Sequence, residues 1–223
     1  MILHFTIFFT IIAIKILLLY KRRELLYNYK MKIILASGSP RRCDLLKNAG
    51  FDFTVIKSGV SENISKNLPP HVYAQTLAEM KGRDVFYNLL SDCDRNSAVT
   101  VSADTVVYFK GEYLLKPRTP EEAESYLKKL SANTHEVYTG YFVLCKSFSI
   151  TSFEKTLVTF NPLSDDLIKR YIASEKYVGK AGGYGIQDGF PLVKTIDGDY
   201  LNVVGLPVEK IKNILNGILK YEK

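Results

Sequence analysis

The sequence has few residues of the kinds that build zinc sites and disulfide frameworks. It holds only three cysteines, Cys43, Cys93 and Cys145, in 223 residues. These lie far apart, without a C-x-x-C pair or neighbouring histidines, which excludes a zinc site of the usual spacing and favours a reducing compartment. The string G-x-x-x-x-G-K-[ST] is also missing, so the chain does not belong to the P-loop class of nucleotide-binding proteins.

A broad basic surface is missing as well, although the formal net charge is +7. Residues 1 to 30 contain five Lys or Arg residues and one Glu, so +4 of this charge belongs to them and +3 to the remaining residues. An excess of +3 over about 190 residues is too small for a basic face. We therefore expect no nucleic-acid partner.

The first 30 residues differ in character from the rest of the chain. Met1 to Tyr20 is an apolar run interrupted by Lys15, and a basic cluster follows it. The run reaches the roughly 20 residues that a bilayer requires only by including Lys15, and it lacks the flanks of a signal peptide. A membrane anchor, a targeting segment, and an extension or misassigned start all remain open. We predict one folded domain over residues 31–223, in the cytoplasm and tethered to a membrane only if residues 1–23 insert.

Beyond residue 30 the apolar pattern alternates between strands and helices without internal repeats, which predicts an α/β or α+β domain. The clearest helix start is Thr119-Pro120-Glu121-Glu122, which combines an N-cap, a first-position proline and a capping-box glutamate. Predicted strands are 33–36, 53–56, 98–103, a hairpin over 106–115, 137–146, 150–160, 190–196 and 200–204. Predicted helices are 40–49, 70–90, 120–131, 165–174 and 207–219, with a loop over 92–97.

The segment Ser37 to Arg42 joins a predicted strand to a predicted helix and is built like an anion site. Ser39 can cap that helix, Pro40 fits its first position, and Gly38 permits close approach of a ligand. The N–H groups and the positive end of the helix dipole would face the turn. Its two arginines add planar guanidinium groups that suit phosphate oxygens. The alternative is a capped helix with two solvated arginines.

Asp104 is a single carboxylate between two apolar strand segments. Because a buried and unpaired aspartate is costly, it should bind a cation, contact a lysine or accept a proton. The alternative is an aspartate that closes a turn at a strand end. Lys81 and Lys116, taken singly, look like surface lysines.

Together these strings resemble the Maf family of nucleotide pyrophosphatases, from Met31 to about Val208. The matching strings, in order, are Ser37-Gly38-Ser39-Pro40-Arg41-Arg42, Leu77-Ala78-Glu79-Met80-Lys81, Ser102-Ala103-Asp104-Thr105-Val106-Val107, Lys116-Pro117, His135-Glu136-Val137-Tyr138-Thr139-Gly140, Ala181-Gly182-Gly183-Tyr184-Gly185-Ile186-Gln187 and Asn202-Val203-Val204-Gly205-Leu206-Pro207. One departure is Gly82, where the family usually has alanine, and this glycine is expected to weaken its helix slightly.

The resemblance implies an α/β fold like that of Maf and inosine triphosphatase, with an elongated mixed sheet, helices and two lobes around a central cleft. It implies hydrolysis of a nucleoside triphosphate to monophosphate and pyrophosphate with a divalent metal, Mg²⁺ or Mn²⁺. The implied site residues are Asp104 as the catalytic residue and a metal ligand, Glu62 as a second metal ligand, and Ser37, Arg41, Arg42, Lys81, Thr105, Lys116 and Gln187 as substrate-binding residues.

Three of these positions indicate which branch of the Maf family the sequence resembles, and hence which substrates the resemblance implies. Arg41, Thr105 and Gln187 match the branch that acts on dTTP and UTP, whereas the branch for methylated guanine nucleotides usually has an aromatic residue in place of Arg41. Hydrolysis of modified purine nucleotides and a division regulator that binds nucleotides without turnover remain alternatives. A homodimer also remains open.

Overall fold

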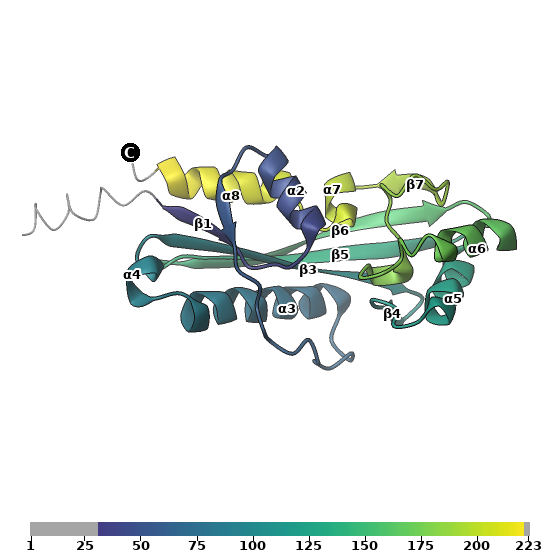
Figure 1. Cartoon of the computed structure of the whole chain (residues 1–223), viewed down its shortest axis with the longest axis horizontal. Coiled ribbons are helices and arrows are strands. Elements are labelled where there is room, and N and C mark those ends of the chain that lie inside the picture. Colours follow the sequence, from purple (N-terminus) through teal and green to yellow (C-terminus); the bar gives the residue numbers. More distant parts are fainter. Residues whose placement is uncertain (1–30, 221–223) are drawn as a thin grey trace, which may run out of the picture.

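The computed structural model describes residues 31–220, so the interpretations of residues 1–30 lie outside the described residues. A mixed seven-stranded sheet forms the body, with the order β2-β1-β3-β5-β6-β7 and with β4 paired to β3 beside this path. The strands are β1 (Lys32–Leu35), β2 (Phe53–Val55), β3 (Ala98–Phe109), β4 (Glu112–Leu114), β5 (Thr134–Leu144), β6 (Ser149–Phe160) and β7 (Val193–Asp197). The predicted α/β class with an elongated mixed sheet is confirmed (Figure 1).

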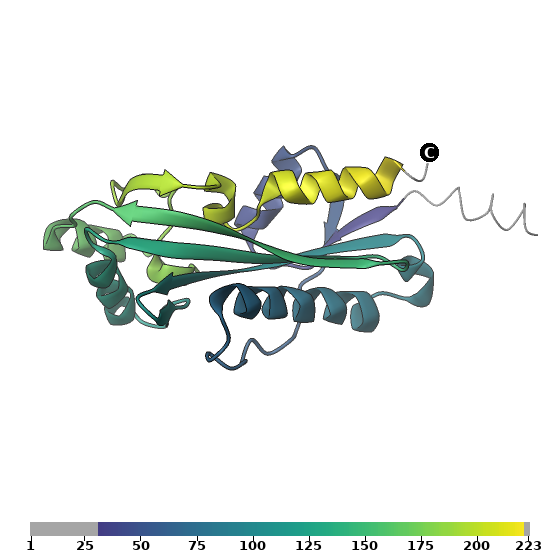
Figure 2. The same cartoon turned by 180° about the vertical axis from the view of Figure 1, so that it is seen from behind.

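Helices cover both faces of this sheet, as the two opposite views show (Figures 1 and 2). Helix α3 lies along one face, and α2 and α8 lie along the other. The helical elements are α2 (Pro40–Asn48), α3 (Pro70–Asp84), the π-helical turn η1 (Val85–Leu89), α4 (Asp92–Arg95), α5 (Pro120–Leu130), α6 (Asp165–Ala173), the 3₁₀ turn η2 (Ala181–Gly183), α7 (Tyr200–Val204) and α8 (Val208–Lys220). Within residues 31–220, no helix combines the length and the apolar character needed to cross a membrane.

The two lobes are the two ends of one continuous sheet. At one end α2 and α8 pack on β1, β3 and β5 around a core that contains Leu35, Leu46 and Ile211. At the other end α5 and α6 close a second core around Leu127 and Tyr171. Strand β3 has twelve residues and therefore spans roughly 40 Å, long enough to pass through both cores.

Three predicted elements were wrong, and each error has a local cause. The segments 98–103 and 106–115 are not separated at Asp104, because β3 pairs with β5 without interruption from Thr100 to Tyr108. Residues 200–204 form helix α7 rather than a strand, since the Asp199 carboxylate accepts a hydrogen bond from the N–H of Leu201. Residues 92–95 form a short helix rather than a loop, because the Ser91 side chain caps it.

Helix α3 approaches the sheet at two glycines. A Cβ on Gly140 of β5 would lie 2.3 Å from the carbonyl carbon of Ala74, which shows that the helix backbone rests on this strand. A Cβ on Gly82 of α3 would lie 2.5 Å from Cδ1 of Phe142 and 2.6 Å from Oγ of Ser102. Gly82 is therefore required for close packing of α3 on the sheet. From the sequence we expected only that this glycine would weaken its helix slightly.

Candidate active site

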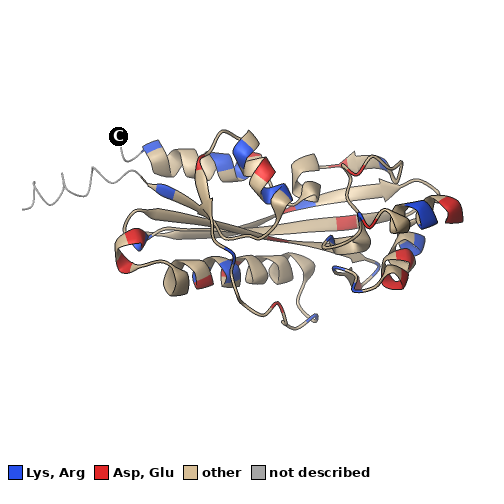
Figure 3. Ribbon diagram, in the orientation of Figure 1, with Lys and Arg blue, Asp and Glu red and all other residues tan. Residues whose placement is uncertain are grey.

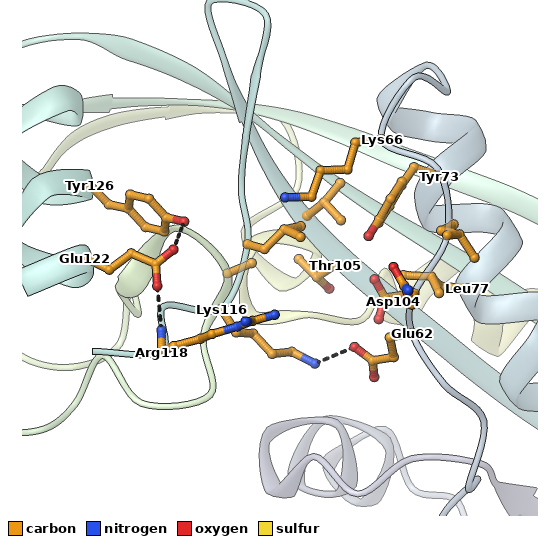
Figure 4. Close-up of a pocket in the computed structure, with 15 residues that line it drawn as sticks. Glu62, Lys66, Tyr73, Leu77, Asp104, Thr105, Lys116, Arg118, Glu122 and Tyr126 are labelled. Carbon is orange, nitrogen blue, oxygen red and sulfur yellow. Dashed lines mark hydrogen bonds and ion pairs between the residues drawn. The ribbon is translucent and has the colours of Figure 1, made fainter. Parts of the chain in front are cut away.

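Three adjoining hollows form a cleft across the middle of the molecule. The largest, of about 710 Å³, is lined by Asp104, Glu62 and Lys116 (Figure 4). A second, of about 520 Å³, is lined by the turn Ser37 to Arg42 together with Lys81, and it shares Glu62 and Lys116 with the first. A third and narrower hollow is lined by Arg41, Arg42, Thr105 and Gln187. The cleft thus brings together all nine residues that the sequence singled out.

Asp104 lies in the middle of β3 and is almost fully buried, with 4% of its surface exposed. Its Oδ1 atom accepts a hydrogen bond from Nζ of Lys81 on α3 at 2.5 Å. This contact follows from the close seating of α3 at Gly82, the next residue. The structure places Asp104 against a lysine within an unbroken strand, and the alternative of a turn-closing aspartate is excluded.

Glu62 joins the same cluster from the loop between β2 and α3. Its Oε1 atom lies 2.8 Å from Nζ of Lys81, and its Oε2 atom lies 3.2 Å from Nζ of Lys116. Partial burial alone would raise the pKa of Glu62, but hydrogen bonds and charge interactions with the two lysines outweigh it and lower this pKa to about 2. Glu62 is therefore an anion at neutral pH, and so two carboxylates face one buried ammonium group.

Arg42 is fixed by protein groups within the cleft. Its Nε donates to the carbonyl oxygen of Gly205 at 2.8 Å, and one Nη donates to Oγ1 of Thr105 at 3.1 Å. Burial lowers the pKa of Arg42, while the negative charge of Asp104 opposes this effect. Because these bonds use only part of the guanidinium fork, the remaining N–H groups can meet a phosphate oxygen.

The turn before α2 differs in one detail from the expectation. Ser39 occupies the N-cap position, but its side chain makes no capping hydrogen bond. Instead, the N–H of Ser39 donates to Oγ of Ser37 at 3.2 Å, and this hydroxyl lies 3.5 Å from an Nη of Arg42. The prediction that the Ser39 side chain caps α2 is therefore wrong, although the turn itself lines the cleft.

The narrow hollow is built by segments far apart in the sequence. Thr105 shares a hydrogen bond of 2.9 Å with the hydroxyl of Thr139, which donates to the carbonyl oxygen of Asn202. Arg41 donates from Nε to the carbonyl oxygen of Val204 at 3.4 Å. Gln187 is exposed and lines the same hollow. The hollow therefore offers a guanidinium group, a hydroxyl group and an amide.

Several polar residues that line the cleft were not predicted as site residues. Lys66, Tyr73 and Arg118 line the largest hollow (Figure 4), and Lys180 lines the narrow one. Arg118 stands two residues after Lys116, so the signal for it was a second basic residue in the same loop. Lys66 and Tyr73 carry no sequence signal of their own, because only the folded loop before α3 brings Lys66 to the cleft and only the packing of α3 on the sheet brings Tyr73 there.

The donor atoms in this cleft fit a hard divalent cation. Among residues 31–220 no group of three or more His, Cys, Asp and Glu side chains could hold a metal alone. Asp104 and Glu62, however, both direct an oxygen at the ammonium group of Lys81, so two carboxylates already converge on one cation. Mg²⁺ and Mn²⁺ prefer oxygen ligands, and Mg²⁺ is commonly held by one or two carboxylates with water and substrate phosphates supplying the rest.

The fold and the site define an α/β protein with an arginine- and lysine-lined cleft around a buried aspartate. Figure 3 shows that basic and acidic residues are interspersed along the ribbon as a whole. The family model described as Maf-like protein matches residues 32–218. The chain therefore belongs to the Maf family.

Curated relatives agree with this assignment. A protein named dTTP/UTP pyrophosphatase from Thermosipho melanesiensis is 41% identical over 186 residues, which cover 83% of this chain and 97% of that protein. Its namesake from Thermosipho africanus is 46% identical over 186 residues, or 83% of this chain and 92% of that protein. A third, from Bacillus cereus, is 42% identical over 181 residues, or 81% and 92%.

Proposed function

We propose that this protein hydrolyses nucleoside triphosphates, with dTTP and UTP as its substrates, to the monophosphate and pyrophosphate. The observation that carries the proposal is Asp104, a buried carboxylate held 2.5 Å from Lys81 in a cleft lined by cationic side chains. Relatives named for this activity, at 41 to 46% identity over most of the chain, support it.

The triphosphate would be held by the turn before α2 and by the lysines that face it. Ser37 and the turn offer a hydroxyl and backbone N–H groups, Arg42 offers free guanidinium N–H groups, and Lys116 lines the same hollow. These groups are fixed before the substrate arrives, so they can stabilise the charge that develops on the departing pyrophosphate.

Asp104 would accept the proton of the water that attacks the α-phosphorus. Its contact with Nζ of Lys81 at 2.5 Å holds the carboxylate in one orientation towards the cleft. Asp104 and Glu62 would also hold the divalent cation, Mg²⁺ or Mn²⁺. This ion, when bound, supplies Lewis-acid stabilisation of the phosphate oxygens.

The narrow hollow would recognise the base. The side-chain amide of Gln187 can donate one hydrogen bond to a ring carbonyl group and accept another from the ring N–H group, and thymine and uracil present both groups side by side. Arg41 and Thr105 face the same space. Arg41 can donate from an Nη to a carbonyl oxygen of the ring. The hydroxyl proton of Thr105, in contrast, is donated to Thr139, so Thr105 acts by holding Arg42 beside the base.

The test is pyrophosphate release by the full-length protein from dTTP, UTP, CTP, dATP and GTP, with Mg²⁺ and with Mn²⁺. We expect turnover of dTTP and UTP well above that of the other three. Absence of turnover with every nucleotide would reject the enzymatic function, and a preference for the purines would reject the roles given to Arg41, Thr105 and Gln187.

A further inference from the structure

Lys180, which lines the narrow hollow, belongs to a buried ion pair that has no part in the proposed mechanism. Nζ of Lys180 is 2.5 Å from both carboxylate oxygens of Asp188. The two side chains are only 12% and 7% exposed. Burying two charges is costly unless their geometry is good, so this pair must be held in one arrangement by its surroundings.

The surroundings include the hydroxyl group of Tyr171 on α6, a side chain that is fully buried. This hydroxyl donates to Oδ2 of Asp188 at 2.6 Å and accepts from the N–H of Gly185 at 3.1 Å. Gly185 and Asp188 are the two ends of a turn, in which the N–H of Asp188 donates to the carbonyl oxygen of Gly185 at 3.2 Å. One hydroxyl group therefore fastens both ends of the turn that carries Gln187.

Two further contacts restrict the same turn. A Cβ on Gly185 would lie 2.7 Å from both carboxylate oxygens of Asp188 and from Nζ of Lys180, so the ion pair lies directly against the turn backbone. In addition, Nζ of Lys176 donates to the carbonyl oxygen of Asp188 at 2.7 Å. Gln187 thus stands on a segment whose backbone is fastened on both sides of it.

The charge of Asp188 also reaches across the hollow. Burial lowers the pKa of Arg41, and the nearby negative charge of Asp188 opposes this effect. Since Asp188 neutralises Lys180, the hollow does not present a free ammonium group beside Arg41. A hollow with less net positive charge suits an uncharged base better than a phosphate group.

We propose that Asp188, with Lys180 and Tyr171, is a positioning unit that fixes Gln187 for recognition of the pyrimidine edge and so determines the preference for uracil over cytosine. This inference rests on the proposed function for the identity of the ligand. Uracil and cytosine differ at N3 and at position 4, where their donor and acceptor patterns are reversed. Discrimination between them therefore depends on where the amide of Gln187 is held.

The test is equilibrium binding of the α,β-imido analogues of UTP and CTP to the full-length protein, measured by calorimetry with Mg²⁺. Asp188→Asn removes the charge, and Tyr171→Phe removes only the hydroxyl group. A matched control is Glu112→Gln, which breaks an ion pair with Lys129, 2.7 Å apart, that does not line the cleft. Thermal midpoints of all variants check the fold.

We expect the wild type to bind the UTP analogue more tightly than the CTP analogue. This preference should fall about tenfold in Asp188→Asn and at least about threefold in Tyr171→Phe, the effect of one or two displaced hydrogen bonds. The preference should stay unchanged in the control. If Asp188→Asn fails to fold, Tyr171→Phe carries the test.

The inference is overturned if the preference is the same in both variants as in the wild type, or if both analogues lose affinity equally, as a purely structural role would cause. A wild type without any preference overturns it too. Because the analogues are not cleaved between the α- and β-phosphates, this outcome is separate from the proposed function, which is decided by pyrophosphate release from UTP itself.

Discussion

Replacing Gly82 with alanine is expected to destabilise the protein, although the same change in an open helix stabilises it. The added Cβ would lie about 1 Å closer to Phe142 and Ser102 than ordinary van der Waals contact allows. Neither neighbour can retreat easily, because the ring of Phe142 is fully buried and the hydroxyl of Ser102 donates to the carbonyl oxygen of Ala78 at 2.6 Å. Two opposing effects therefore decide the sign of the change.

Their magnitudes favour destabilisation. Alanine is about 1 kcal/mol more favourable than glycine within a helix. Overpacking of a well-packed core costs about 1 to 3 kcal/mol, and an overlap with two buried neighbours belongs in the upper part of this range. We expect a net decrease of about 1 to 2 kcal/mol in the free energy of unfolding. Because Lys81 precedes Gly82, a displaced α3 should also weaken the contact between Lys81 and Asp104 and lower the turnover rate.

The assay is urea denaturation of the full-length protein, with Gly217→Ala as the matched control. Gly217 lies in α8 with nothing within 4 Å of an added Cβ, so its replacement should raise stability by about 0.5 to 1 kcal/mol. If Gly82→Ala stabilises the protein as much as Gly217→Ala does, the argument that Gly82 seats α3 on the sheet is refuted.

Three further outcomes are expected. Thr119→Ala removes the N-cap hydrogen bond of 3.2 Å from the N–H of Glu122 and should lower the free energy of unfolding by about 1 kcal/mol. The activity per folded molecule should not change, and a changed activity would show that Thr119 contributes to the site. In the folded protein the pKa of Glu62 is about 2, below its ordinary value of 4.5, so its ionisation contributes stability that is present above pH 4.5 and lost as the pH falls towards 2. The thermal midpoint of Glu62→Gln should therefore fall less over this pH interval than that of the wild type. An equal fall in both proteins would contradict the pairing of Glu62 with the lysines. A chelator should stop pyrophosphate release and added Mg²⁺ or Mn²⁺ should restore it, whereas release that persists in the chelator would exclude the metal.

Local sequence signals predicted the elements well where one signal dominated. The N-cap at Thr119 and the proline that opens α2 lie where the pattern placed them, and the hairpin of β5 and β6 forms with bounds shifted by up to three residues. The Glu122 side chain differs from the capping-box prediction, because it accepts from the N–H of Arg118 rather than from that of Thr119. Local signals failed where tertiary contacts overrule local preference. Residues 200–204 are rich in apolar and β-branched side chains, but the buried side chain of Asn202 bonds to Val137 and Thr156, which holds this segment as a helix.

The site was predictable to a similar extent. An aspartate between apolar strand segments must have a partner, and the argument left a cation, a lysine and a proton as possible partners of Asp104. The structure shows the lysine. That this lysine is Lys81, and that Glu62 shares it, was not predicted, because 23 residues separate Lys81 from Asp104 and the family resemblance implied only a substrate contact for Lys81 and a metal contact for Glu62. The unit of Tyr171, Lys180 and Asp188 was not predicted, since its members become neighbours only when α6 packs beside the turn that follows η2.

The central claim, that Asp104 promotes cleavage between the α- and β-phosphates, is tested most directly by the products of UTP turnover with Mg²⁺ in the wild type and in Asp104→Asn. Lys81 keeps Glu62 as its counterion in this variant, so the fold should be retained. We expect UMP and pyrophosphate in equal amounts from the wild type, and a turnover number at least about 100-fold lower from the variant. Formation of UDP and phosphate, or an Asp104→Asn variant as active as the wild type, would contradict the claim.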